Sequence, residues 1–388
     1  MNPKPLCGVR VLDLTRLLPG PLATLHLADL GADVVKVEDT GAGDYARDAY
    51  PRHGDMSYYF KIINRNKRSL RLDLKQAEGV AVFLRLARDA DVIIESFRPG
   101  VVDKLGIGYE AVRAINPRIV YCAITGYGQS GPYAMRAGHD LNYIGYAGVL
   151  DQIGVAGGAP ALPNLQIGDM LGGAMSALVP LLAALLAARA TGQGDFIDVA
   201  MTDGVLAHAI FPLVALRGGG RARQRGDDVL TGGLACYGVY ATADGRHLAV
   251  AALEPKFWHL LCDTLQRPDL KPLQYADGEQ GAFAKAALAR IFAGHSLRHW
   301  TDIFDGIDCC VTPVLTLEET LANEQIQARQ MLMEVDGVPQ FASPWKLRHT
   351  ADGAATPAPH AGEHSAEVLR EAGYAEAQIE ALRQARVI

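Results

Sequence analysis

The stretch VRVLDLTRLLPGPLATLHLADLGADVVKV, residues 9–37, decides the fold of this chain. It begins with an apolar run at 9–14, continues with a helix-like segment at 21–30, and ends with a second apolar run at 33–37. Parallel strands need a crossover connection, which is usually a helix. The stretch therefore predicts a β-α-β unit at the start of the chain.

The same alternation continues to about residue 125. Strand-like runs recur at 69–73, 91–95 and 118–125, with helix-like segments at 75–88 and 101–115 between them. Short apolar runs rich in β-branched residues are typical of parallel strands that are covered on both faces. We predict an α/β fold with a doubly wound parallel sheet.

The pattern changes beyond this region. Residues 139–213 are mostly helix-like, and 236–252 indicate two strands joined around Asp244-Gly245, a dipeptide that suits tight hairpins. We predict a large domain at 1–216, a Gly/Arg-rich linker at 217–228 and a smaller α+β domain at 229–325. Residues 326–388 are expected to pack back on the large domain.

Composition excludes several classes of protein. The chain has 388 residues and a formal net charge of -6, which argues against a general nucleic-acid binder. Its six cysteines show neither metal-site nor disulfide spacing, so a reducing, cytoplasmic location is expected. Residues 170–188 carry no charge, but they include glycine, serine and proline, so we expect a buried helix rather than a membrane span.

One histidine and one carboxylate stand out as candidate chemistry. His139 follows Gly138, and Asp169 follows Gly168 just before a long apolar run. Such a pair can move a proton at a carbon next to a carbonyl if both side chains reach one pocket. The competing interpretations are a hydrogen-bonded packing role for His139 and a helix N-cap for Asp169.

Two further features have alternative interpretations. The backbone amides of Asp169 or Met170 could hold the oxygen of a substrate carbonyl as it becomes an enolate. Glu254, which precedes Pro255 between a strand and a helix, could cap that helix, or it could orient a histidine and raise its basicity.

A basic cluster follows the second predicted strand. Its residues are Arg65, Lys67, Arg68, Arg71 and Lys75, and further along Arg98 and Lys104 follow the strand at 91–95. Carboxyl ends of parallel strands are where open α/β sheets bind ligands, so these side chains could hold phosphates. A solvated charged face is the alternative for the first cluster.

Several motifs in the same order as these residues carry a family resemblance. They include VLDL (11–14) through PGP (19–21), NKRSL (66–70), LDLK (72–75), TGYGQSG (125–131), GHDLNY (138–143) and CVTPV (310–314). With these motifs the sequence resembles the α-methylacyl-CoA racemases, within the wider family III CoA transferases. The resemblance covers most of the chain.

This resemblance implies an acyl-CoA enzyme with a Rossmann-like large domain. It further implies an interlocked homodimer whose active sites combine one subunit's large domain with the other's small domain. His139 and Asp169 become the two acid/base groups, and Glu254 of the other subunit becomes the partner of His139. The expected CoA contacts are Leu72, Asp73, Leu74, Lys75, Arg98, Lys104, Gly138, Asp140 and Tyr143.

One departure from the family pattern concerns phosphate recognition. Several racemases carry an arginine shortly after the strand at 34–38, and Asp39 stands there in this chain. Phosphate recognition then depends on Arg98, Lys75 or the basic cluster, or the CoA site differs.

The leading hypothesis is racemisation of 2-methylacyl-CoA by proton transfer between His139 and Asp169. No metal or redox cofactor is expected, since CoA is part of the substrate, and neither nucleic acid nor membrane is an expected partner. The alternative is a CoA transferase in which Asp169 attacks the thioester and passes through an anhydride to an aspartyl-CoA. His139 and Glu254 favour racemisation, and their presence also speaks against a CoA-binding protein without turnover.

Overall fold

The computed structural model describes residues 2–350 and 353–388, which form two compact units. The larger unit contains the chain up to Ala147, Asn164–His208 and the segment from Gln327 onward. The smaller unit contains Gly148–Pro163 and Ala209–Ile326. The division predicted from the sequence keeps 148–163 and 209–216 with the large domain and treats 217–228 as a linker, whereas contacts group all three stretches with the smaller unit.

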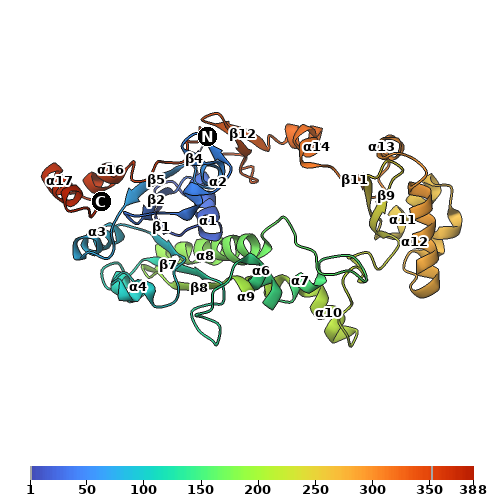
Figure 1. Cartoon of the computed structure of the whole chain (residues 1–388), viewed down its shortest axis with the longest axis horizontal. Coiled ribbons are helices and arrows are strands. Elements are labelled where there is room, and N and C mark those ends of the chain that lie inside the picture. The colour runs from blue at the N-terminus through green and yellow to red at the C-terminus, as the bar shows by residue number, and fades with distance from the viewer. Residues whose placement is uncertain (1, 351–352) are drawn as a thin grey trace. The chain divides into compact units, whose positions relative to one another are not determined.

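A parallel sheet forms the centre of the larger unit, as the sequence predicts (Figure 1). It has six strands, and the sixth, at Phe196–Ala200, lies in the stretch that the sequence predicts to be mostly helical. The strand order is β5-β2-β1-β6-β7-β8. The strands are β1 (Arg10–Leu14), β2 (Asp33–Glu38), β5 (Lys67–Arg71), β6 (Val92–Glu95), β7 (Val120–Thr125) and β8 (Phe196–Ala200). The direction of chain progression reverses between β1 and β6, which makes this the topological switch point of the sheet.

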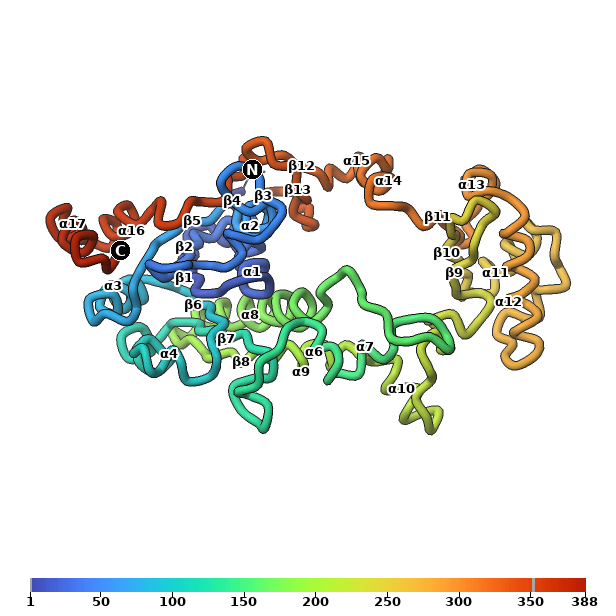
Figure 2. Tube along the Cα trace, viewed as in Figure 1, coloured from blue at the N-terminus to red at the C-terminus, as the bar shows by residue number. Residues whose placement is uncertain are grey.

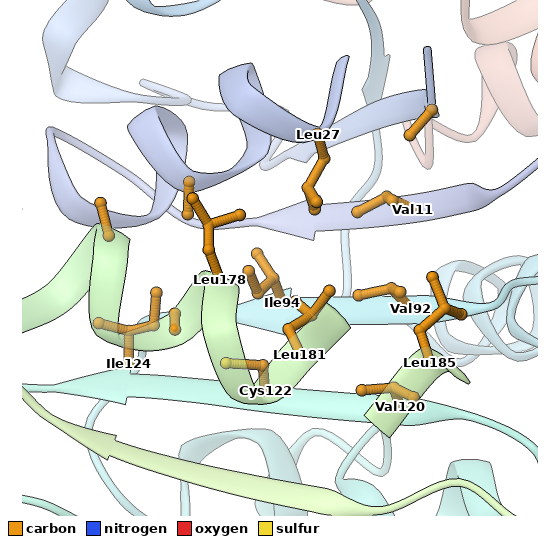
Figure 3. Close-up of a cluster of buried hydrophobic side chains, with 14 of the residues drawn as sticks. Val11, Leu27, Val92, Ile94, Val120, Cys122, Ile124, Leu178, Leu181 and Leu185 are labelled. Carbon is orange, nitrogen blue, oxygen red and sulfur yellow. The ribbon is translucent and has the colours of Figure 1, made fainter. Parts of the chain in front are cut away.

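Helices cover both faces of this sheet. On one face, α1 (Pro19–Asp29) and α8 (Ser176–Thr191) share a buried cluster with Val11, Val92 and Val120. Figure 3 shows Leu178, Leu181 and Leu185 of α8 packed among these strand residues. Successive strand residues point to opposite faces, so Leu12 and Ile93 belong to the other cluster, beneath α3 (Ala77–Ala87), α16 (Ser365–Glu371) and α17 (Glu376–Gln384).

The long apolar helical run lies in this core. Within the described residues, Gly168–Thr191 is the one helical segment that is long and apolar enough to cross a membrane. Leu178, Leu181 and Leu185 are buried between α1 and the sheet. These contacts account for the apolar residues on the buried side of the helix, whereas Val179 and Leu186 of the same helix are exposed.

The remaining elements of the larger unit connect or follow the strands and helices described above. Figure 2 traces the chain through them. They are η1 (Tyr45–Asp48), β3 (Arg52–His53), β4 (Met56–Ser57), α2 (Tyr58–Ile63), α4 (Val101–Lys104), α5 (Tyr109–Arg113), α6 (Asp140–Tyr146), the π-helix η2 (Gly168–Met175), α9 (Met201–His208), α15 (Glu324–Ala328) where it enters this unit, and the hairpin of β12 (Leu332–Val335) with β13 (Val338–Phe341). Strand β13 packs against α2.

The smaller unit has its own antiparallel sheet, in agreement with the predicted α+β class. The strand order is β11-β10-β9, from β9 (Tyr237–Ala241), β10 (His247–Ala251) and β11 (Val311–Pro313). Gly245, at φ +72°, lies in the turn between β9 and β10. The helical elements are α7 (Val149–Gln152), α10 (Ile210–Gly218), α11 (Pro255–Thr264), η3 (Pro268–Leu273), α12 (Gly278–Phe292), α13 (Leu297–Phe304) and α14 (Leu317–Ala322), and the core includes Trp258, Phe292 and Trp300.

Candidate functional site

A cavity of about 610 Å³ lies in the larger unit at the switch point of the sheet. Its wall is formed by the segments that follow β1, β6 and β7, together with the start of α6 and of η2. The lining includes Arg16, Leu17, Tyr45, Phe97, Arg98, Arg136, Gly138, His139, Tyr143 and Asp169. Ligands of open α/β sheets bind in this position, so the cavity is the candidate active site.

Asp169 sits in the first turn of η2 and has an unusual electrostatic environment. Its backbone N–H donates to Oδ2 of Asp140 at 3.0 Å, so two carboxylates lie close together. Burial, and then the negative charge of Asp140, raise the pKa of Asp169 from its ordinary 3.8 to about 7. A carboxyl with such a pKa can both accept and donate a proton near neutral pH.

His139 lines the same cavity as Asp169, as the proton-transfer hypothesis requires. It is the residue immediately before α6, and its N–H donates to Oδ1 of Asn142 at 3.0 Å. His139 is exposed rather than buried in the core, so the packing interpretation of this residue is not supported.

Glycine at 138 allows the segment before His139 to lie close to two tyrosine rings. A Cβ at Gly138 would lie 2.8 Å from the ring of Tyr143 and 2.9 Å from the hydroxyl of Tyr127. The Tyr143 hydroxyl donates to the carbonyl of Gly138. Burial, together with the charge of Asp169, raises the pKa of Tyr143 to about 12, so this hydroxyl remains a donor.

The helix-start hypotheses for Asp169 require correction. The N–H of Asp169 is bound to Asp140, and the N–H of Met170 donates to the carbonyl of Gln166 at 2.8 Å. Both amides are therefore engaged within the protein and are not available to an enolate oxygen. The helix begins at Gly168, with Ile167 in the N-cap position, so Asp169 is not the capping residue either.

Three members of the basic cluster, Arg65, Lys67 and Arg68, are held by carboxylates of the protein and do not form a solvated charged face. Arg65 pairs with Asp29, and Lys67 lies 3.2 Å from the buried carboxylate of Asp13. Arg68 is held by Asp33 and by carboxylates of α16. These cations are internal partners of acidic side chains, which the density of charge in the sequence could not reveal.

The expected CoA contacts divide into two groups. Arg98, Gly138 and Tyr143 line the cavity, and Asp140 supports Asp169 behind it. The residues that follow β5 are not among the lining residues: Leu72 is buried, and Asp73 accepts hydrogen bonds from the Lys75 N–H and from Gln76. Lys75 and Lys104 are exposed elsewhere on the surface of this unit.

Glu254 belongs to the smaller unit. It occupies the N-cap position of α11, but its side chain makes no capping hydrogen bond. The side chain is exposed. The capping interpretation is thus not supported.

The sequence reasoning missed several side chains at the cavity. Arg16 pairs with Asp39 at 2.7 Å and lies over the rings of Tyr45 and Phe97. Tyr59 of α2 is not among the lining residues, but burial, and then the charges of Asp44 and Asp169, raise the pKa of its hydroxyl. The position of Arg16 directly after a central strand was the one available signal, because that is where ligands of such sheets bind.

Comparison with known proteins identifies the family of this chain. The model of CoA-transferase family III matches residues 6–365. The chain belongs to CoA-transferase family III.

Proteins with different activities resemble this chain. It is 37% identical to the alpha-methylacyl-CoA racemase of Mus musculus, over 99% of this chain and 97% of that protein. It is 34% identical to the acetyl-CoA:oxalate CoA-transferase of Acetobacter aceti, over 96% and 97%. The crystal structure of a CAIB/BAIF family protein from Brucella suis matches with a TM-score of 0.84 and 29% identity, over 96% of this chain and all of that one.

Family III membership makes this protein an enzyme of the CoA-transferase and racemase type, acting on acyl-CoA. Both kinds of reaction occur among the similar proteins, so the reaction itself must be argued from the site. Among the described residues, no cluster of three or more His, Cys, Asp and Glu side chains is arranged to hold a metal ion.

Proposed function

We propose that this protein racemises 2-methylacyl-CoA thioesters by 1,1-proton transfer through an enolate. The observation that carries the proposal is that His139 and Asp169 line one cavity, with the pKa of Asp169 raised to about 7. A base that works at neutral pH is most effective when its pKa is close to that pH.

The reaction divides the work between these two side chains. The thioester makes the α-proton more acidic, and either His139 or Asp169 removes it, depending on which enantiomer is bound. The other group then returns a proton to the opposite face of the carbon. Holding the substrate between two fixed groups replaces a bimolecular encounter and accelerates both transfers.

CoA is proposed to enter as part of the substrate, with no further cofactor. Arg98 lines the cavity and is a suitable partner for a phosphate, because its planar guanidinium donates paired hydrogen bonds. Leu72–Lys75 and Lys104 remain proposed contacts for the part of CoA outside the cavity.

We further propose the interlocked homodimer in the cytoplasm. Helix α8 exposes Val179 and Leu186, and α10 exposes Phe211 and Val214, each at more than half of its maximal area. Apolar side chains exposed to this extent on two helices of one chain favour a protein interface. Glu254 of the second subunit would then act on His139.

A CoA transferase is the second candidate, favoured by the similarity to the Acetobacter aceti enzyme. In that reaction the ionised Asp169 attacks the thioester carbon and CoA thiolate leaves, giving an acyl-aspartyl anhydride. The thiolate then attacks the Asp169 carbonyl to give aspartyl-CoA and free acid. Transfer needs no base on the opposite face, so it leaves His139 without a role.

The distinguishing experiment supplies one enantiomer of a 2-methylacyl-CoA in heavy water, without an acceptor acid. Racemisation predicts deuterium at the α-carbon together with loss of optical activity. A transferase leaves the α-proton in place and turns over only after a carboxylic acid is added.

A further inference from the structure

Beneath the segment that joins β1 to α1 lies a group of fully buried charges. The Lys36 ammonium and the Asp44 carboxylate are 2.8 Å apart, and both side chains are completely inaccessible to solvent. Burying an ion pair is expensive unless further hydrogen bonds satisfy both groups. Here the additional hydrogen bonds go to the backbone of Thr15 and Leu17.

These backbone contacts fix the cavity segment. Lys36 Nζ donates to the carbonyl of Thr15 at 2.8 Å. The N–H of Leu17 donates to Oδ1 of Asp44 at 3.0 Å, and the same oxygen accepts the N–H of Ala46 at 3.0 Å. One ion pair therefore holds the backbone on both sides of Arg16.

The conformation that is held is a strained one. Leu17 has φ +64°, in the left-handed region that non-glycine residues rarely adopt. Such strain persists only where the surroundings enforce it, and it clusters at functional sites. Leu17 and Arg16 both line the cavity.

The side chain of Arg16 is presented at the cavity by this segment. Its guanidinium pairs with Asp39 at 2.7 Å and lies 5.4 Å from the ring centre of Tyr45. Asp39 itself accepts the N–H of Gly41 at 2.8 Å, so it serves as a turn residue and as the anchor of Arg16. A cation held on one side by a carboxylate keeps donors for a second anion.

We propose that Lys36 and Asp44 are positioning residues for CoA: their ion pair imposes the left-handed conformation at Leu17 and thereby directs Arg16 toward a phosphate of the substrate. The proposal rests on the acyl-CoA function above and assigns the phosphate contact that Asp39 leaves open. Lys36 and Asp44 touch no substrate atom and act only through the Thr15–Leu17 backbone.

The test uses the double variant K36M/D44N, which leaves no unpaired buried charge. Binding of free CoA is measured by calorimetry on folded protein, followed by KM and kcat for the acyl-CoA. The CoA dissociation constant and KM are expected to rise about 10-fold, as loss of a hydrogen bond to a charged group implies, with kcat nearly unchanged. The matched control R52M/D48N removes an exposed ion pair and should change neither constant.

A rescue separates positioning from simple stabilisation. Adding Leu17→Gly to K36M/D44N should recover about fivefold in CoA affinity, because glycine adopts the left-handed conformation without penalty. Leu17→Gly alone serves as the control for the lost side chain. Parental CoA affinity in K36M/D44N, or no recovery on adding Leu17→Gly, would overturn the proposal.

A second variant covers the case in which K36M/D44N does not fold. Arg16→Ala changes a surface side chain, and it should weaken binding of CoA while leaving the acyl-pantetheine substrate, which lacks the nucleotide phosphates, unaffected. Equal CoA affinity in Arg16→Ala and the parent contradicts the proposal. Failure of the parent to bind CoA at all contradicts instead the function on which the proposal rests.

Discussion

Replacement of Asp169 by asparagine is expected to abolish racemisation and to stabilise the protein at alkaline pH. The pKa of Asp169 is raised to about 7 from its ordinary 3.8, first by burial and then by Asp140. Folding therefore opposes ionisation of this carboxyl. Asparagine has nearly the same shape and does not ionise, so it removes this penalty.

The pH window follows from the direction of the shift. Between about pH 4 and pH 7 the folded protein binds a proton that the unfolded chain has released, so the free energy of unfolding falls as the pH rises. The full penalty applies above pH 7. Three pKa units correspond to about 4 kcal/mol, and solvent at the cavity wall reduces this to about 2 kcal/mol.

Thermal unfolding of the parent and of Asp169→Asn across pH 4 to 8 measures the effect. At about 2 °C per kcal/mol for a chain of this size, the variant should melt about 4 °C above the parent at pH 8 and at the same temperature near pH 4. Asp151→Asn, at an exposed carboxylate of the smaller unit, provides a control without this pH dependence. A difference that does not change with pH would refute a raised pKa at Asp169, and with it the proposed base.

Three further predictions concern neighbouring residues. Asp140→Asn removes the second cause of the raised Asp169 pKa, so the acid limb of the pH–rate profile should move to lower pH. At pH 6 the parent has about one Asp169 in ten ionised, which limits the gain in relative rate to about tenfold. An unmoved acid limb would contradict the coupling between the two carboxylates. Asp13→Asn leaves Lys67 buried without its carboxylate and should lower the free energy of unfolding by about 3–5 kcal/mol, measured with denaturant at pH 7. Burial raises the pKa of Asp13, but Lys67 and Lys36 outweigh it and hold the pKa at about 2, so in the parent this stabilisation is lost only as the pH falls from about 4 toward 2. An unchanged free energy of unfolding in the variant would contradict the pairing. Gly172→Ala places a Cβ 2.2 Å from the carbonyl oxygen of Met201 and should destabilise the protein by about 1–3 kcal/mol. Gly145→Ala in α6, where nothing lies within 4 Å of the new Cβ, is the control and should not destabilise it. Similar unfolding curves for both variants would show that η2 and α9 can separate without penalty.

The parallel sheet could be predicted from the sequence because its signal is local. The central strands are short apolar runs because both faces of the sheet are buried, so Val11 and Leu12 are both apolar although they point to opposite clusters. The edge strand β5, with the sequence KRSLR, does not have this pattern. The strand order, and hence the switch point that places the cavity, depends on contacts between segments far apart in the chain. The residues of a single strand do not reveal which other strands it pairs with, so the strand order could not be predicted.

Residues of the site that stand out within a single segment could be predicted from the sequence, whereas pairings between distant segments could not. His139 and Asp169 stand out because each follows a glycine in a distinctive segment. The pairing of Lys67 with Asp13 and of Arg16 with Asp39 joins residues 54 and 23 positions apart, and only the folded chain brings them together. Charge density along the sequence therefore suggested a phosphate site at the basic cluster, where the structure has internal ion pairs.

The central claim is that His139 and Asp169 serve opposite faces of one carbon. Its most direct test follows α-proton exchange of each 2-methylacyl-CoA enantiomer in heavy water with His139→Ala and Asp169→Asn. Each variant should lose racemisation and exchange the proton of a single enantiomer, and the two variants should retain opposite enantiomers. Exchange of the same enantiomer by both variants, or undiminished racemisation in either, would contradict the claim.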